Sequence, residues 1–232
     1  MDPLNLKKLN SARQNRRAVI LLTELSSGRD RIILEGDSVA GELGEACRKA
    51  FLSGKSTTLK IGDNEMFLNV QVPAPRIVVI GAVHISQALA QMAGIAGYDL
   101  EVIDPRTAFA TPERFVGVKL SADWPQEVMT DETLDAFTAL IAVTHDPKID
   151  DYPLAQALKS DCFYVGALGS RKTHAKRLER LAEAGLSEEQ SARIHAPIGL
   201  DIGASSPQEI AVAILAQIID AFRKRGIEQG LS

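Results

Sequence analysis

The sequence predicts an α/β protein: a Rossmann-like, doubly wound and mostly parallel sheet, preceded by a smaller α+β domain. Residues 77–80 read Ile-Val-Val-Ile, an apolar β-branched run typical of a strand buried on both faces of a parallel sheet. Gly81 follows, and apolar residues then recur at helical spacing as far as Ala96. A second apolar run, residues 100–103, leads into Asp104. Such a strand–turn–helix–strand unit opens a nucleotide-binding sheet.

Composition narrows the class of protein. A chain of 232 residues can hold one large domain or two smaller ones. The net charge of −4 and the aromatic content of 5% argue against a dedicated nucleic-acid binder. No apolar run approaches the roughly 20 residues of a membrane span, and the start of the chain lacks the apolar segment of a secretory signal. Two cysteines suit a reducing compartment, so we expect a cytoplasmic protein.

The first 74 residues read as a small α+β domain. The segment Pro73-Ala74-Pro75 removes two backbone donors and predicts the boundary, so that residues 75–232 form the Rossmann-like domain. The smaller domain is expected to contain strands at 18–22 and 31–34, a helix at 41–51, and a hairpin of strands at 55–61 and 65–72.

The larger domain continues with alternating strand and helix patterns. After the opening unit we expect strands at 116–120, 138–143 and 162–165, and helices at 150–159 and from 171 to about 184. A capping box at Ser187 starts a further helix, and Ser206 with Pro207 starts the last one. This last helix should bury Ile210, Ile214, Ile218 and Phe222. This long apolar helix could support a homodimer or could simply pack in the core.

Ligands of a doubly wound sheet bind beyond the carboxyl ends of its strands. Four strand ends supply candidate binding residues, which we expect to share one edge. They are Gly81, Ala82, Val83 and His84 after the first strand, Asp104 and Arg106 after the second, Thr144, His145 and Asp146 after the third, and Gly166, Gly169, Ser170 and Arg171 after the fourth.

The turn after the first strand departs from the dinucleotide fingerprint G-x-G-x-x-G. Only Gly81 is present, because Val83 and Ser86 stand at the second and third glycine positions. The local signal for NAD is therefore weak. The prediction of the fold is unaffected, since it rests on the hydrophobic pattern.

Each strand end allows two interpretations. Residues 166–172 could cradle a phosphate, through free backbone, a hydroxyl and a helix N-terminus beside Arg171, or could be a glycine turn before a solvated basic helix. Asp104 lies about 20 residues after Gly81, where an acid would meet a ribose hydroxyl, or it only begins an Asp-Pro turn. Arg106 could instead receive a phosphate.

Histidines and cysteines give little further chemistry. His145 could orient a ligand or shuttle a proton, or it belongs to an ordinary strand-exit turn. The four histidines show no paired spacing, so we expect no metal site, and no catalytic residue stands out. Residues 195–203 should form an ordered loop under the site. Cys47 and Cys162 are expected to pack as small hydrophobic residues.

Several stretches resemble the XdhC/CoxI family of accessory proteins, which help to mature molybdenum hydroxylases such as xanthine dehydrogenase and carbon monoxide dehydrogenase. The matching stretches are IVVIGAVHISQAL, VIDPRTAFATPERF, THDPKIDD, YVGALGSRKTHAKRLERL and IHAPIGLDIGASSPQEIAVAILAQI. The resemblance implies a Rossmann-like C-terminal domain behind a smaller N-terminal one. It also implies a chaperone that binds molybdenum cofactor, supports its sulfuration and delivers it to the apo-enzyme.

The resemblance assigns parts to the residues of the edge. Backbone amides and Arg171 would hold the phosphate of molybdopterin or of its dinucleotide form, Asp104 a ribose or pterin donor, and His145 would orient the ligand. The implied partners are a molybdenum hydroxylase apo-enzyme and a cysteine desulfurase. Many members read Gly-Ala-Gly-His where this chain has Val83, and many carry a Ser-Gly-Gly-Cys segment that has no match here, which leaves the part of Cys47 open.

Two other functions use the same edge. An NAD(P)-dependent oxidoreductase would need His145 or His195 near the hydride acceptor and would bind nicotinamide despite Val83. A regulatory module would bind a nucleotide and transmit its state.

Overall fold

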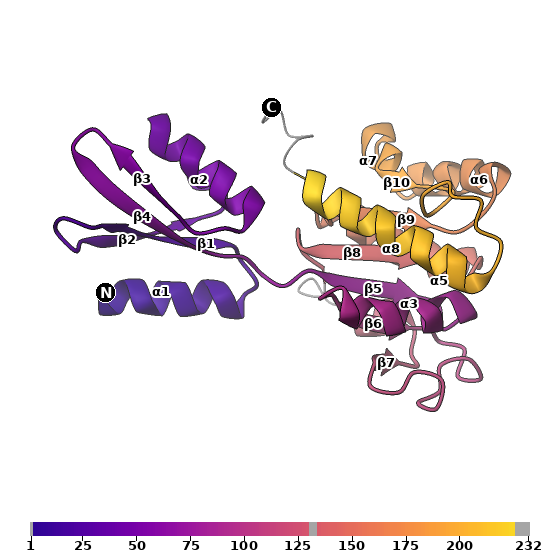
Figure 1. The fold of residues 1–232 in the computed structure, drawn as a ribbon. Helices are drawn as coiled ribbons and strands as arrows, with labels where there is room; N and C mark the ends of the chain where they lie inside the picture. Colours follow the sequence, from indigo (N-terminus) through magenta and orange to yellow (C-terminus); the bar gives the residue numbers. More distant parts are fainter. Residues whose placement is uncertain (1, 130–133, 226–232) are drawn as a thin grey trace. The chain divides into compact units, whose positions relative to one another are not determined.

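A computed structural model of the chain describes residues 2–129 and 134–225. The chain forms two compact units. The first is built by the residues up to Pro73 together with Arg225, and the second spans Ala74–Lys224 (Figure 1). None of the helices in these described ranges combines the length and the apolar character that crossing a bilayer requires.

The first unit is a four-stranded antiparallel sheet with strand order β2-β1-β4-β3. Its strands are β1 (Val19–Glu24), β2 (Asp30–Leu34), β3 (Thr57–Ile61) and β4 (Asn64–Gln71), and its helices are α1 (Pro3–Gln14) and α2 (Gly41–Ser53). The two helices lie on opposite faces of the sheet (Figure 1). Helix α1 was not predicted, because only Leu9 and Ala12 are buried in it and the apolar period is too weak to read.

The second unit contains a six-stranded sheet in which every neighbouring pair is parallel. The strand order β10-β9-β8-β5-β6-β7 is the Rossmann order, with the chain reversing direction across the sheet between β5 and β8. This confirms the predicted fold class. The strands are β5 (Arg76–Ile80), β6 (Asp99–Ile103), β7 (Lys119–Ser121), β8 (Thr138–Ala142), β9 (Tyr164–Ala167) and β10 (Ile194–His195).

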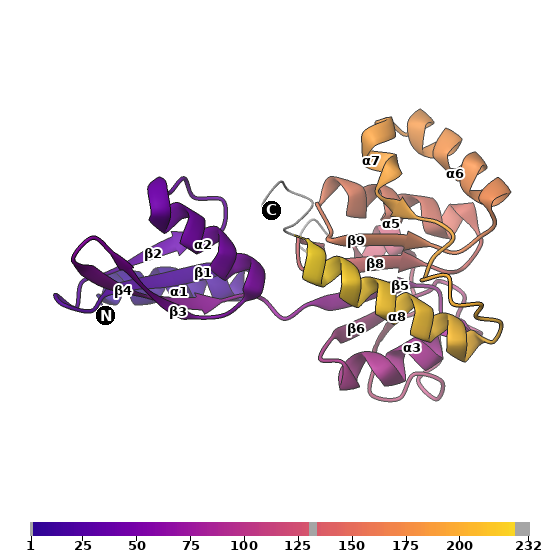
Figure 2. The same ribbon diagram turned by 45° about the horizontal axis from the view of Figure 1, so that its top comes forward.

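Helices cover both faces of the parallel sheet. Ile77 and Val79 of β5 face an apolar cluster with α3 (His84–Ile95) and α8 (Pro207–Lys224), whereas Val78 and Ile80 face the cluster of α5 (Pro147–Lys159). Helices α3 and α8 lie side by side on their face (Figure 2). Because a strand alternates its side chains, covering both faces requires the unbroken apolar run of the sequence. The remaining helices are α4 (Pro125–Val128), α6 (Arg171–Glu183) and α7 (Glu188–Ala192).

Some element bounds differ from the predictions. Helix α5 begins at Pro147, because the side chain of Asp146 accepts the amide of Lys148 and caps the helix. The predicted strand at 162–165 lies at β9 instead, since the amide of Cys162 bonds the carbonyl oxygen of Ala157 behind α5. The strand predicted at 116–120 is the shorter β7. In α8, Ile214 and Ile218 are buried as predicted, but Ile210 and Phe222 are only half-buried.

Both cysteines, Cys47 and Cys162, are buried and free, as the predicted packing requires. Burial raises the pKa of each thiol, which makes both less reactive as nucleophiles at neutral pH.

Candidate functional site

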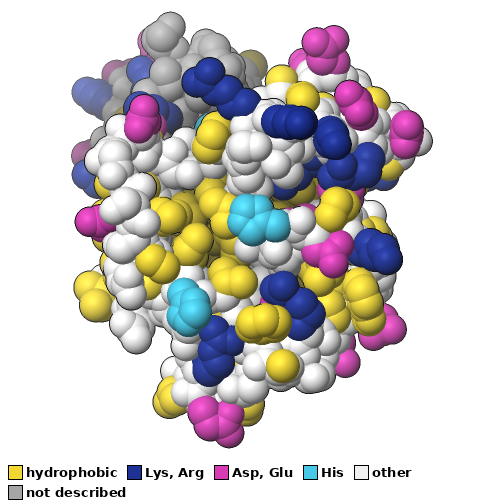
Figure 3. All heavy atoms as spheres, turned by 90° about the vertical axis from the view of Figure 1, so that its right-hand side faces the viewer, with side chains coloured by type: hydrophobic (Ala, Val, Ile, Leu, Met, Phe, Trp, Pro, Cys, Tyr) yellow, Lys and Arg dark blue, Asp and Glu magenta, His cyan; other side chains and the backbone are white. Residues whose placement is uncertain are grey.

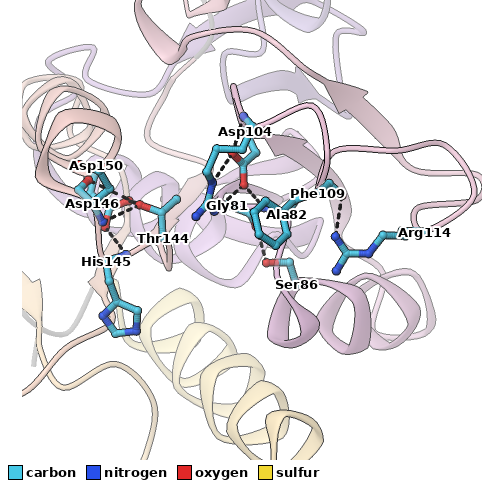
Figure 4. Close-up of polar contacts among 11 residues, drawn as sticks. Gly81, Ala82, Ser86, Asp104, Phe109, Arg114, Thr144, His145, Asp146 and Asp150 are labelled. Atoms are coloured by element: carbon cyan, nitrogen blue, oxygen red, sulfur yellow. Dashed lines mark hydrogen bonds and ion pairs between the residues drawn. The ribbon is translucent and has the colours of Figure 1, made fainter.

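The turn after β5 depends on glycine. Gly81 has a φ of 118°, and a Cβ there would lie 2.9 Å from Cγ2 of Thr144, at the end of β8. The absence of a side chain lets the ends of these two neighbouring strands approach each other. Ser86 replaces the third glycine of the fingerprint and is fully buried, and its hydroxyl donates to the carbonyl oxygen of Gly81 at 2.5 Å. Figure 4 shows these residues at the switch point of the sheet.

Asp104, at the end of β6, is fully buried and holds this turn in place. Its Oδ2 accepts the amide of Ala82 and Nη2 of Arg106, each at 2.7 Å, and its Oδ1 accepts the amide and Nε of Arg106, each at 2.9 Å. Burial raises the pKa of Asp104, but the bonds from Arg106 and Ala82 outweigh burial and hold the pKa below its ordinary value. Protein donors already engage both oxygens. Asp104 therefore orders this turn within the protein, and the ribose contact expected from its spacing stays a prediction.

Two arginines fasten the loop that follows β6. The guanidinium of Arg106 lies 4.7 Å from the ring centre of Phe109. Arg114 donates to the carbonyl oxygen of Phe109 at 2.7 Å and to Oε1 of Gln87 on α3 at 3.0 Å, as Figure 4 shows in part. Arg106 thus keeps a partly exposed cation at the edge. Neither Phe109 nor Arg114 was predicted, because no local pattern links a loop side chain to a helix in front of it.

The turn after β8 is organised by a carboxylate that the sequence did not reveal. Asp150 of α5 is 1% exposed. Its Oδ1 accepts the hydroxyl of Thr144 at 2.7 Å, and its Oδ2 accepts the amide of His145 at 3.1 Å (Figure 4). The hydroxyl of Thr144 in turn accepts the amide of Asp146 at 3.0 Å. His145 has a φ of 67°, a conformation that residues other than glycine seldom adopt.

The fourth segment leads from β9 into α6. Ser170 caps α6 by accepting the amide of Thr173 at 3.2 Å, and Gly169 has a φ of 138°. Gly166 is buried, and a Cβ there would lie 2.7 Å from side-chain atoms of Tyr164 and Ile198, so this glycine serves packing. Arg171 is exposed at the first position of the helix.

All four predicted segments therefore lie at the same edge of the sheet, where the parallel strands end. Figure 3 looks onto this face and shows histidine, Lys and Arg side chains around a hollowed, largely hydrophobic surface. The predicted residues differ in exposure: His84, His145, Ser170 and Arg171 are exposed, Val83, Arg106, Asp146 and Gly169 are partly exposed, and Gly81, Ala82, Asp104, Thr144 and Gly166 are buried.

Several groups at the edge favour an anion, although the carboxylates of Asp104 and Asp146 lie in the same segments. The first turn of a helix leaves amide groups without partners inside the helix, and α3 has no side-chain cap. The side chain of Val83 packs partly against the apolar cluster under α3 and α8. Arg106 and Arg171 add positive charge at the edge. Over residues 2–129 and 134–225, no group of three or more His, Cys, Asp or Glu side chains is arranged to hold a metal ion.

Comparison with known proteins identifies relatives of this chain. The family model described as the XdhC Rossmann domain matches residues 77–218. The chain is 34% identical to the uncharacterized protein YqeB of Escherichia coli over 68% of its own length and 29% of the relative. It is 31% identical to the molybdenum cofactor insertion chaperone PaoD of Escherichia coli over 63% of its own length and 40% of the relative. It is 30% identical to a Bacillus subtilis protein named as a probable component of xanthine dehydrogenase, over 69% of its own length and 46% of the relative. The match thus spans less than half of each curated relative.

A solved structure supports the fold. The crystal structure of a protein described as a xanthine dehydrogenase from Bacillus halodurans superposes with a TM-score of 0.63. It covers 96% of this chain and 65% of the other, at 24% sequence identity.

Proposed function

The chain belongs to the XdhC Rossmann-domain family, and we propose that it is a chaperone that binds molybdenum cofactor and inserts it into a molybdenum hydroxylase of the xanthine dehydrogenase type. The relative named as a molybdenum cofactor insertion chaperone supports this function. The observation that carries it is the edge itself. The uncapped N-terminus of α3 lies at the switch point of the sheet, and His84, His145, Arg106 and Arg171 follow the carboxyl ends of its parallel strands.

The residues at the edge fit a phosphorylated pterin. A phosphate or pyrophosphate is stabilised by the amides at the N-termini of α3 and α6 and by the charge of Arg171. Arg106 is held by Asp104 and stacked on Phe109, so it offers a fixed cation to a second anionic group. His84 and His145 supply ring nitrogens for hydrogen bonds to the pterin. The cofactor is cargo in this scheme, and the edge needs only to hold and release it.

The proposal extends to maturation of the cargo. A cofactor bound on an exposed edge is accessible to a cysteine desulfurase for sulfuration and then to the apo-enzyme, both as cytoplasmic partners. The dinucleotide form of the cofactor would place its ribose beside Arg106, because the carboxylate of Asp104 is engaged within the protein. A homodimer would present two such edges.

Titration of the purified protein with molybdopterin tests the proposal. We expect saturable binding by the wild-type protein and a Kd raised about tenfold in Arg171→Ala, as for the loss of one charge-assisted contact. Lys176→Ala is the matched control, because Lys176 is exposed on the same helix but beyond its first turn. The loaded protein should then restore activity to an apo-hydroxylase. Absence of binding by the wild-type protein would refute the function.

The strand order also suits a second function, an oxidoreductase that binds NAD(P) at the same edge. The engaged carboxylate of Asp104 weighs against it, since the usual ribose acceptor is occupied. Titration with NAD(H) and NADP(H) distinguishes the two functions. Tight nicotinamide binding with turnover would favour the enzyme.

A further inference from the structure

A buried cluster of charge lies directly beneath the edge, between α5 and α6. Its two charged members are Asp150 and Arg177, which are 1% and 2% exposed. Burial raises the pKa of Asp150 and lowers the pKa of Arg177, and the attraction between the two groups opposes both shifts. Burying charged groups is unfavourable for stability unless they are fully bonded. A core of hydrophobic side chains would serve the fold better, so this placement calls for another reason.

Asp150 acts on the turn after β8. Its two oxygens take the hydroxyl of Thr144 and the amide of His145, so one carboxylate engages two successive residues. The hydrogen bond from the amide of His145 to Asp150 helps to hold His145 at positive φ. This conformation directs an exposed imidazole from the end of β8. The conformation of His145 is therefore set by a residue of the next helix.

Arg177 acts on the segment after β9. Its side chain runs back toward the N-terminus of α6, where Nη2 donates to the carbonyl oxygen of Leu168 at 3.0 Å. The amide of Leu168 donates to the carbonyl oxygen of Ala142 at the end of β8. Arg177 thus connects the loop of Gly169 and Ser170 to the strand that carries His145.

The bonding of Arg177 is incomplete. Among the described residues, its buried Nε and Nη1 have no hydrogen-bond partner, and neither has Nδ1 of His174 one turn earlier. Burial lowers the pKa of Arg177, and attraction to Asp150 and Asp151 opposes this lowering without outweighing it. The missing hydrogen bonds of Arg177 are unfavourable for stability, so we look for the role of Asp150 and Arg177 in the turns that they hold.

We propose that Asp150 and Arg177 are a pair of positioning residues that set the turns after β8 and β9 in the geometry that receives the cargo. Neither residue touches the cargo. The inference rests on the proposed function for the identity of the cargo. It goes further by assigning the shape of two of the four binding segments to two residues that are absent from the surface.

Amide hydrogen exchange and molybdopterin titration test the pair together. In Asp150→Asn the amide of His145, which the carboxylate protects, should exchange at least about tenfold faster, and the Kd for molybdopterin should rise about tenfold. Arg177→Met should weaken binding similarly and accelerate exchange at Leu168. Asp151→Asn and Arg180→Met are the matched controls, because Asp151 and Arg180 pair with each other on the same two helices at the more exposed surface and act on Arg177 through charge alone. The controls should change neither quantity.

The outcomes separate the inference from the proposed function. Wild-type protein that does not bind molybdopterin refutes the function, while exchange at His145 still decides whether Asp150 holds the turn. Wild-type binding with an unchanged Kd and an unchanged exchange rate in Asp150→Asn overturns the inference. If Asp150→Asn does not fold, Thr144→Val removes the hydroxyl bond to the same carboxylate and is judged by the same two measurements.

Discussion

A methyl group of Thr144 fills the space that a side chain at position 81 would need, since a Cβ built on Gly81 would lie 2.9 Å from Thr144 Cγ2. The contact joins the two strands on either side of the switch point. It explains why this one glycine of the dinucleotide fingerprint is present.

Gly81→Ala should destabilise the protein by about 1–3 kcal/mol from backbone strain alone, because Gly81 has a φ of 118°. Urea unfolding measures the change. Gly94→Ala is the control, since Gly94 lies in α3 with open space where a Cβ would be added, and it should be neutral or slightly stabilising. Adding Thr144→Ser to Gly81→Ala removes the methyl group and should recover part of the loss. No recovery would show that the contact is unimportant.

Asp104→Asn should destabilise the protein by about 2 kcal/mol, as for hydrogen bonds to a charged group, and should release Arg106. The pKa of Asp104 in the folded protein lies below its ordinary value of 3.8. Its contribution is therefore fully present above pH 3.8 and is lost as the pH falls through the folded pKa. Unfolding experiments from pH 6 to pH 2 should show the wild-type advantage over Asp104→Asn shrinking only at the acid end. A constant difference would contradict this.

Asp150 should have the opposite pH dependence. Burial raises its pKa from 3.8 to about 6, against the lowering effects of Thr144 and Arg177. The folded state therefore binds the proton more tightly than the unfolded state, so the contribution to stability is full below pH 3.8 and is lost as the pH rises through about 6. Relative to Asp150→Asn, the wild-type protein should gain on the order of 3 kcal/mol between pH 7 and pH 4.

The groups that face this carboxylate must be included in that measurement. They are the hydroxyl of Thr144, the amide of His145 and the guanidinium of Arg177, with Arg106 and Arg180 contributing at longer range. The buffer series is therefore repeated with Arg177→Met, which should raise the pKa of Asp150 further, because the attraction that favours its charged form is gone. An unshifted profile would mean that Arg177 does not act on Asp150.

Arg114→Ala should loosen the loop after β6, because Arg114 joins Phe109 to Gln87 of α3. We expect a loss of stability of about 1–2 kcal/mol and faster hydrogen exchange at residues 109–110, with weaker molybdopterin binding through Arg106. Val116→Ala is the control, since Val116 is 83% exposed nearby and should change nothing. Unchanged exchange in Arg114→Ala would show that the loop is held by other contacts.

The sequence by itself determined the parallel sheet and the set of segments that meet at its edge. Runs such as residues 77–80 and 138–142 are apolar at almost every position because helices cover both faces, and parallel strands bring their carboxyl ends to one side. The same pattern could not show α1, whose buried surface amounts to two side chains.

Only the tertiary structure decided which edge residues face outward and which hold the others. Asp104 and Arg106 are two residues apart, and Thr144 and Asp150 are six apart. This spacing could not reveal that protein donors engage both oxygens of Asp104, or that Asp150 accepts the amide of His145. A solvated basic helix was one of the two interpretations of the segment after residue 166, but Arg177 of that helix is 2% exposed. Burial is a property of neighbours brought together from distant segments, and a local pattern cannot contain it.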